Sequence, residues 1–164
     1  MIEFTAISTL WKLFAWMPKF IMKRMFTKEK LSNLVMFDVR PRHEYAHIDL
    51  GEVPKYTLWL QLTNLAPVPI ALDRAEITFT CAGVELKSSI LKREIIESGE
   101  TRSFHVDGTI DVANAKFIGK TWDKNNSNIS ANIEFNCELH NFSKQTGRLE
   151  GVIPSFINAP KNNA

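Results

Sequence analysis

The sequence has little of the chemistry that marks common enzyme classes. It contains no glycine-rich phosphate loop, no nucleophile elbow and no C-x-x-C pair. These absences exclude the familiar nucleotide-binding, α/β-hydrolase and thiol-redox motifs. The two cysteines, Cys81 and Cys137, fall on the apolar phase of alternating stretches, so we interpret them as buried thiols, neither metal ligands nor a disulfide framework. We therefore expect a non-catalytic protein that needs no cofactor.

The chain also has little net charge, at +2 for 164 residues, but that charge is unevenly placed. Residues 1–33 hold six basic and two acidic residues, whereas the rest of the chain is slightly acidic. A nucleic-acid-binding protein would spread positive charge over its folded domain, so we do not expect nucleic acid as a partner. A basic end favours a membrane surface rich in anionic lipid.

Residues 2–26 predict an amphipathic helix. Placed at 100° per residue, lysine and hydroxyl side chains gather on one face, and a broad apolar face that includes Trp11, Ile21 and Met25 covers the other. This composition is typical of a helix that lies in the bilayer interface. The predicted membrane-binding residues are Phe4, Trp11, Lys12, Phe14, Trp16, Lys19, Phe20, Lys23 and Arg24.

Two other interpretations of this segment stay open. A transmembrane span needs about 20 mostly apolar residues, and Lys12, Pro18 and Lys19 interrupt the run. Alternatively, the helix packs on its own domain or on a partner protein. In either membrane arrangement the basic residues follow the apolar stretch, so the positive-inside rule predicts that the following domain faces the cytoplasm.

From about residue 34 onward, alternation replaces the helical period. Residues 56–63, 75–81 and 129–139 alternate apolar and polar side chains, as in strands with one buried face. No strand alternates with a helix-length segment, which argues against a parallel α/β sheet, and residues 116–124 are expected to form a solvated loop. The pattern predicts about seven short strands in an all-β sandwich over residues 34–157, followed by a flexible tail over residues 158–164. The predicted strands lie within residues 34–39, 56–63, 75–81, 84–86, 104–112, 129–139 and 148–153.

Several short motifs in this region resemble the WHy domain of the late-embryogenesis-abundant group 2 family of water-stress proteins, over about residues 45–112. Asn64 and the prolines that follow it form a turn between two strands, although Leu65 and Ala66 stand where the family has a proline directly after the asparagine. The resemblance implies an immunoglobulin-like antiparallel sandwich, no catalysis, and a role in membrane-associated protection or in contact with protein or lipid. The motifs are His47-Ile-Asp-Leu-Gly51, Leu62-Thr-Asn-Leu-Ala-Pro-Val-Pro-Ile70, Leu72-Asp-Arg74, Gly83 and Ser98-Gly-Glu100.

Two alternative functions remain. The first is a zinc-dependent hydrolase, because His43-Glu44-Tyr-Ala-His47 matches the H-E-x-x-H pattern in which two histidines on one helix face bind zinc. Pro41 and Gly51 bound the segment closely and disfavour a long helix. The alternation of residues 46–50, with Ala46, Ile48 and Leu50 on the apolar side, indicates a strand instead. His105 and His140 are the candidate third ligands. The second alternative is a structural subunit whose N-terminal helix packs on a partner.

Overall fold

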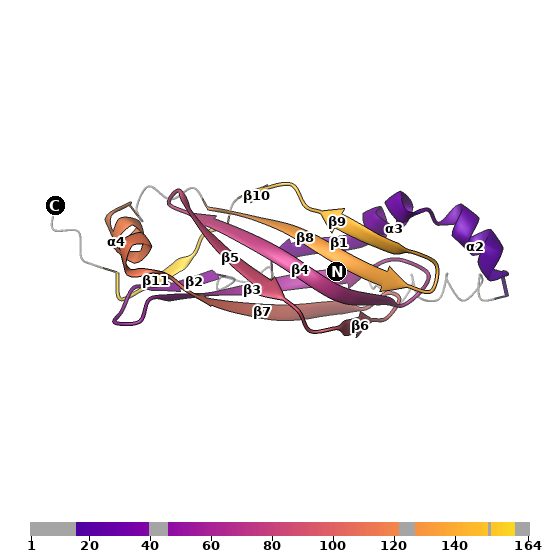
Figure 1. Ribbon diagram of the computed structural model, residues 1–164, viewed down its shortest axis with the longest axis horizontal. Helices are drawn as coiled ribbons and strands as arrows, with labels where there is room; N and C mark the ends of the chain where they lie inside the picture. The colour runs from indigo at the N-terminus through magenta and orange to yellow at the C-terminus, as the bar shows by residue number, and fades with distance from the viewer. Residues whose placement is uncertain (1–15, 40–45, 122–126, 151, 160–164) are drawn as a thin grey trace.

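The computed structural model describes residues 16–39, 46–121, 127–150 and 152–159. In this part of the chain two β-sheets face each other, and helices lie at the two ends of the elongated sandwich (Figure 1). Helices α2 (Lys19–Met25) and α3 (Lys28–Leu34) lie at one end, and α4 (Val112–Thr121) lies at the other. The protein is therefore mostly β, as the alternation predicts.

The first sheet is organised around β3. It contains β1 (Val35–Val39), β2 (Ala46–Asp49), β3 (Lys55–Asn64), β7 (Thr101–Thr109) and β11 (Ser155–Ile157). Strand β7 pairs with almost the whole length of β3, while β1 and β2 pair with its two halves on the other side. Among the described strands β11 forms the one parallel pair, with β2.

The second sheet is organised around β4 and β8. It contains β4 (Ile70–Cys81), β5 (Val84–Ile90), β6 (Glu94–Ile96), β8 (Asn128–Cys137), β9 (Asn141–Gln145) and β10 (Leu149–Glu150). The central pair is antiparallel, with a register shift between Leu72 and Arg74. Strands β5 and β6 flank β4, and β9 and β10 flank β8.

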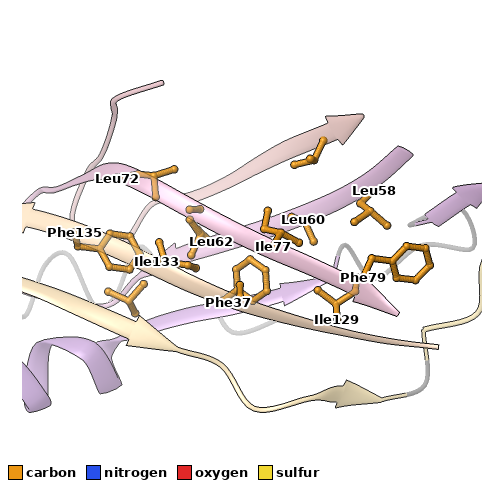
Figure 2. Packing of buried hydrophobic residues seen from close by; sticks show 14 of the residues in the cluster. Phe37, Leu58, Leu60, Leu62, Leu72, Ile77, Phe79, Ile129, Ile133 and Phe135 are labelled. Atoms are coloured by element: carbon orange, nitrogen blue, oxygen red, sulfur yellow. The ribbon is translucent and has the colours of Figure 1, made fainter. Parts of the chain in front are cut away.

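The core lies between the sheets, because alternating positions on each strand point to the same face. Leu58, Leu60 and Leu62 of β3 are buried and approach the side chains of Ile77 and Phe79 of β4 (Figure 2). Their polar neighbours in the sequence face outward, which explains why the period-2 pattern located these strands.

A two-residue turn joins β4 to β5. Ala82 and Gly83 both have positive φ, at 50° and 80°. A two-residue hairpin turn in which both residues have positive φ has a twist that matches the right-handed twist of the flanking strands. Glycine is the natural residue at the second position because it has no Cβ to hinder this conformation.

Two helices differ from the expectations. The connector after residue 27 forms α3, capped by the Thr27 hydroxyl, which accepts from Lys30 N at 3.4 Å. Residues 116–121 of the stretch expected as a solvated loop are part of α4, and residues 122–124 lie outside the described residues. Asp111 caps the start of α4 by accepting from Asn114 N at 2.9 Å. Ile118 of α4 is fully buried against the sandwich. The lysines near it in the sequence gave the segment the polar character of a loop, so this apolar contact was not predicted.

The seven predicted strands correspond to β1, β3, β4, β5, β7, β8 and β10. The structure adds the short strands β6, β9 and β11, and it places β2 where the alternation of residues 46–50 indicated a strand. The immunoglobulin-like topology and the domain boundaries stay predictions.

Candidate membrane-binding site at the N-terminal end

Helix α2 is attached to the end of the sandwich by two side chains one turn apart. Met22 and Phe26 are both buried and belong to the main apolar core. Pro18 precedes the helix, where a residue without an N–H group costs no hydrogen bond. The apolar side that docks is therefore centred on Met22 and Phe26, whereas the predicted apolar face contained Ile21 and Met25, which are partly exposed.

Polar contacts hold α2 against the turn between β8 and β9. Lys19 Nζ lies 2.7 Å from a carboxylate oxygen of Glu138. His140 Nε2 lies 3.1 Å from the carbonyl oxygen of Lys23. The ion pair is exposed and contributes little to stability, but together with the buried side chains it fixes the direction of the helix.

Two aromatic side chains at this end remain in solvent. Trp16 is 79% exposed and Phe20 is 73% exposed. All five described members of the predicted membrane-binding set are exposed, namely Trp16, Lys19, Phe20, Lys23 and Arg24. Phe4, Trp11, Lys12 and Phe14 lie outside the described residues.

Positive charge surrounds these aromatic residues. Residues 16–34 contain five basic residues and one acidic residue, Glu29. Lys23 and Arg24 are in the last turn of α2, where cations interact favourably with the helix dipole. Exposed aromatic side chains and an excess of positive charge thus occur together at this end of the molecule.

Helix α3 gives this end a second attachment. Leu31 is fully buried, and Lys144 Nζ on β9 donates to the carbonyl oxygen of Ser32 at 2.9 Å. Partial burial lowers the pKa of Lys144. The helical projection of residues 2–26 did not indicate Met22 and Phe26 as anchoring residues, and Leu31 lies beyond it. The spacing of Met22 and Phe26 by four residues, which places both on one side of a helix, was the available signal.

The zinc hypothesis finds no support in the geometry at His47. This histidine is in strand β2, and its ring makes an edge contact with Trp59, with ring centroids 4.8 Å apart. A zinc-binding H-E-x-x-H requires both histidines on one helix face, so His47 does not meet that requirement. His43 and Glu44 lie outside the described residues.

The candidate third ligands do not complete a metal site either. His105 is paired with Trp59 across β3 and β7, so it shares the outer face with His47, but His140 is at the α2 end of the molecule. Within the described part of the chain, no group of three or more histidine, cysteine or acidic residues is arranged to hold a metal ion.

Asn64, the central residue of the WHy-like motif, has a structural role. Its side chain is fully buried and donates to the carbonyl oxygens of Val68 and Ile96, both at 3.0 Å, while its Oδ1 accepts from Ala66 N at 2.9 Å. Its backbone carbonyl oxygen accepts from Gly99 N at 2.7 Å. The asparagine therefore joins the end of β3 to two loops.

The Ser98-Gly99-Glu100 motif forms the other half of this junction. Gly99 has φ of 79°, which a residue with a Cβ rarely adopts. Ser98 Oγ donates to the carbonyl oxygen of Ala66 at 2.6 Å, and Glu97 N donates to Glu100 Oε2 at 2.7 Å. This last bond, together with Arg102, lowers the pKa of Glu100.

Among the helices of the described residues, none combines the length and the apolar character that crossing a bilayer requires.

Comparison with known proteins gives a likeness of fold. No protein-family model and no curated protein sequence matches the chain. The structural genomics target SoR45 is similar over 72% of this chain and 85% of its own, with 10% identity and a TM-score of 0.50. A protein of Arabidopsis thaliana matches 70% of this chain and 82% of its own at 12% identity, with a TM-score of 0.48.

A third solved structure, described provisionally as a late embryogenesis abundant (LEA) protein, matches 91% of this chain and 89% of its own. Its identity is 11% and its TM-score is 0.42. At such low identities, the similarity to SoR45 shows that this two-sheet β architecture also occurs in other proteins, and it shows the fold alone.

Proposed function

We propose that the protein is a membrane-attached, non-catalytic β-sandwich that binds protein or lipid, with its N-terminal end as the attachment site and the β domain facing the cytoplasm. The observation that carries the proposal is the arrangement of α2. One side of this helix is fixed in the core by Met22 and Phe26, while Trp16 and Phe20 remain exposed beside basic residues.

The expected binding free energies favour reversible attachment to an anionic surface. Burying a large apolar side chain contributes about 1.5–3 kcal/mol, and each Lys or Arg close to an anionic leaflet contributes about 1 kcal/mol. Two exposed aromatic residues and a cluster of cations such as Lys23 and Arg24 supply both kinds of interaction. A site for a partner helix would use the apolar residues but would not need the excess of cations.

The WHy-like motifs are consistent with this proposal. Two of them, residues 62–70 and Ser98-Gly99-Glu100, meet in a buried junction centred on Asn64. In this interpretation the sandwich is a stable scaffold, and its activity is binding at the membrane surface, as the resemblance to water-stress proteins implies.

Co-sedimentation of the full chain with vesicles tests the proposal. We expect binding to vesicles that contain phosphatidylserine, weaker binding to pure phosphatidylcholine, and release as salt screens the attraction. Replacing Trp16 and Phe20 by serine should weaken the binding at least about tenfold, given the apolar area removed. Leu91→Ser is the matched control, because Leu91 is also an apolar residue, 71% exposed, but lies outside the basic segment.

Two results would contradict the proposal. Binding that is unaffected by the double serine variant would place the attachment elsewhere in the chain. No binding to either kind of vesicle would favour the structural-subunit alternative, in which the same exposed residues contact a partner helix.

A further inference from the structure

Helix α4 and the connection from β2 to β3 lie at the end of the molecule opposite α2 (Figure 1). A cleft is lined by residues of these two segments. Its volume is about 470 Å³, within the range of small-molecule sites in proteins. Leu50 and Pro54 line one side, and Val112 and Ala115 of α4 line the other. These walls are mostly apolar.

Hydrogen bonds between segments far apart in the sequence hold the walls of this cleft in place. Asp49 Oδ1 accepts from Gly51 N at 2.9 Å and from Asn158 Nδ2 at 2.8 Å. These two bonds lower the pKa of Asp49. Ile110 N, just before α4, donates to the carbonyl oxygen of Pro54 at 2.8 Å. The cleft is therefore preformed, because its lining segments are tied to one another.

One face of α4 is turned toward the cleft. Val112, Lys116 and Lys120 follow one another at intervals of four residues, so they share a side of the helix. Gly119 lies on the same face and has no side chain that would fill the space. Val112 is 61% exposed, which leaves part of the apolar wall open to solvent.

The charges of the lining residues determine which charge a bound ligand should carry. Lys116 and Lys120 contribute two ammonium groups, and Glu52 contributes one carboxylate. Among the described residues neither lysine forms an ion pair with an acidic group. The described lining residues thus carry one net positive charge, which complements a monoanion better than a dianionic phosphate.

We propose that this cleft binds the carboxylate form of a free fatty acid. The alkyl chain lies against Leu50, Pro54 and Val112, and the carboxylate accepts hydrogen bonds from the ammonium groups of Lys116 and Lys120. This site is separate from the attachment end and does not depend on the function proposed above.

Calorimetric titration of the full chain with straight-chain carboxylates, kept below their micelle concentrations, tests the proposal. We expect saturable one-site binding of decanoate, with affinity rising about fourfold per added methylene from hexanoate upward. Lys116→Gln combined with Lys120→Gln should weaken decanoate binding up to about tenfold. The same variant should bind the neutral chain decanol as the unaltered protein does.

A change in the apolar wall supplies the second arm. Val112→Asp should abolish the binding of both decanoate and decanol, and because Val112 is largely exposed this variant should fold, as thermal unfolding will show. Phe20→Ser is the matched control, since Phe20 is exposed at the other end of the molecule; it should leave decanoate binding unchanged even if vesicle binding is lost.

Three results would overturn the proposal. They are the absence of saturable decanoate binding, unchanged affinity in Val112→Asp, and equal affinity of the unaltered protein for decanoate and decanol. Amide chemical shifts provide a check on location: decanoate should move the signals of Val112, Ala115 and Gly119, and perturbations confined to residues 16–34 would contradict the assignment.

Discussion

The ring of Tyr56 lies directly over Gly108, its register partner across β3 and β7. A Cβ placed on Gly108 would overlap the aromatic ring of Tyr56. The Tyr56 hydroxyl continues across the sandwich to β5 in the other sheet, where it donates to the carbonyl oxygen of Lys87 at 3.1 Å and contacts Ser88 Oγ. The glycine therefore makes room for a tyrosine that connects the two sheets.

Gly108→Ala should destabilise the protein by about 1–3 kcal/mol, because the added methyl group forces the ring of Tyr56 out of its place. Urea unfolding measures the change. Gly147→Ala is the matched control, since a Cβ there meets nothing within 4 Å, and it should be close to neutral. Equal stability of the two variants would show that Tyr56 does not need the space over Gly108.

Tyr56→Phe should cost about 1 kcal/mol at neutral pH, the typical value of a lost hydrogen bond. Burial raises the pKa of Tyr56 above its ordinary value of 10.0. Above that value the unfolded chain releases the phenol proton while the folded protein retains it, so stability falls as pH rises. Unfolding measured from neutral pH to beyond 10.0 should show a steeper decline for the unaltered protein than for Tyr56→Phe. Parallel curves would contradict the assignment.

Asn64→Ala should destabilise the protein by about 2–3 kcal/mol. The change leaves the buried carbonyl oxygens of Val68 and Ile96 and the N–H group of Ala66 without their side-chain partner. Chemical denaturation measures the loss, and Asn132→Ala, at an exposed position of β8, should change stability by less than about 0.5 kcal/mol. A similarly small effect at Asn64 would mean that the loops do not depend on this junction.

The two thiols should differ in reactivity. Cys81 is fully buried, and burial raises its pKa to about 11, so it should not react with a thiol reagent in the folded protein. Cys137 is only partly buried and should react. In Cys137→Ser we expect no titratable thiol in the folded state at about pH 8 and one after denaturation. Rapid labelling of folded Cys137→Ser would show that Cys81 is accessible.

The fold was predictable where local pattern and tertiary environment agree. Strands such as β3 and β8 have one face in the core, so the alternation of residues 56–63 and 129–139 revealed them. Helix α4 was not predicted, because its propensity is weak and its existence depends on the burial of Ile118 against a distant sheet. The short strand β11 was missed for a similar reason, since it is defined by its partner β2.

The sequence predicts which types of residue make up the candidate site, but not how helix α2 is oriented on the sandwich. The exposed aromatic and basic residues around α2, such as Phe20 and Lys23, follow from charge and hydrophobicity along the chain. The side on which α2 docks does not, because Met22 and Phe26 are buried in the main core of the sandwich, and the helix backbone is bonded at Lys23 to His140, 117 positions along the chain. A helical projection ranks faces by hydrophobicity and contains no information on the surface that receives them.

The parallel pairing of β11 with β2 constrains the order in which the first sheet is completed. Asp49 and Asn158, which are hydrogen-bonded beside this pair, are 109 positions apart. During synthesis, the edge of β2 must therefore wait for residues 155–157 to emerge, after every other described strand has been made. Until then its free N–H and C=O groups can pair with another chain. By pairing with β2, strand β11 covers this edge and protects the protein from edge-to-edge aggregation, but only once the end of the chain has been synthesised.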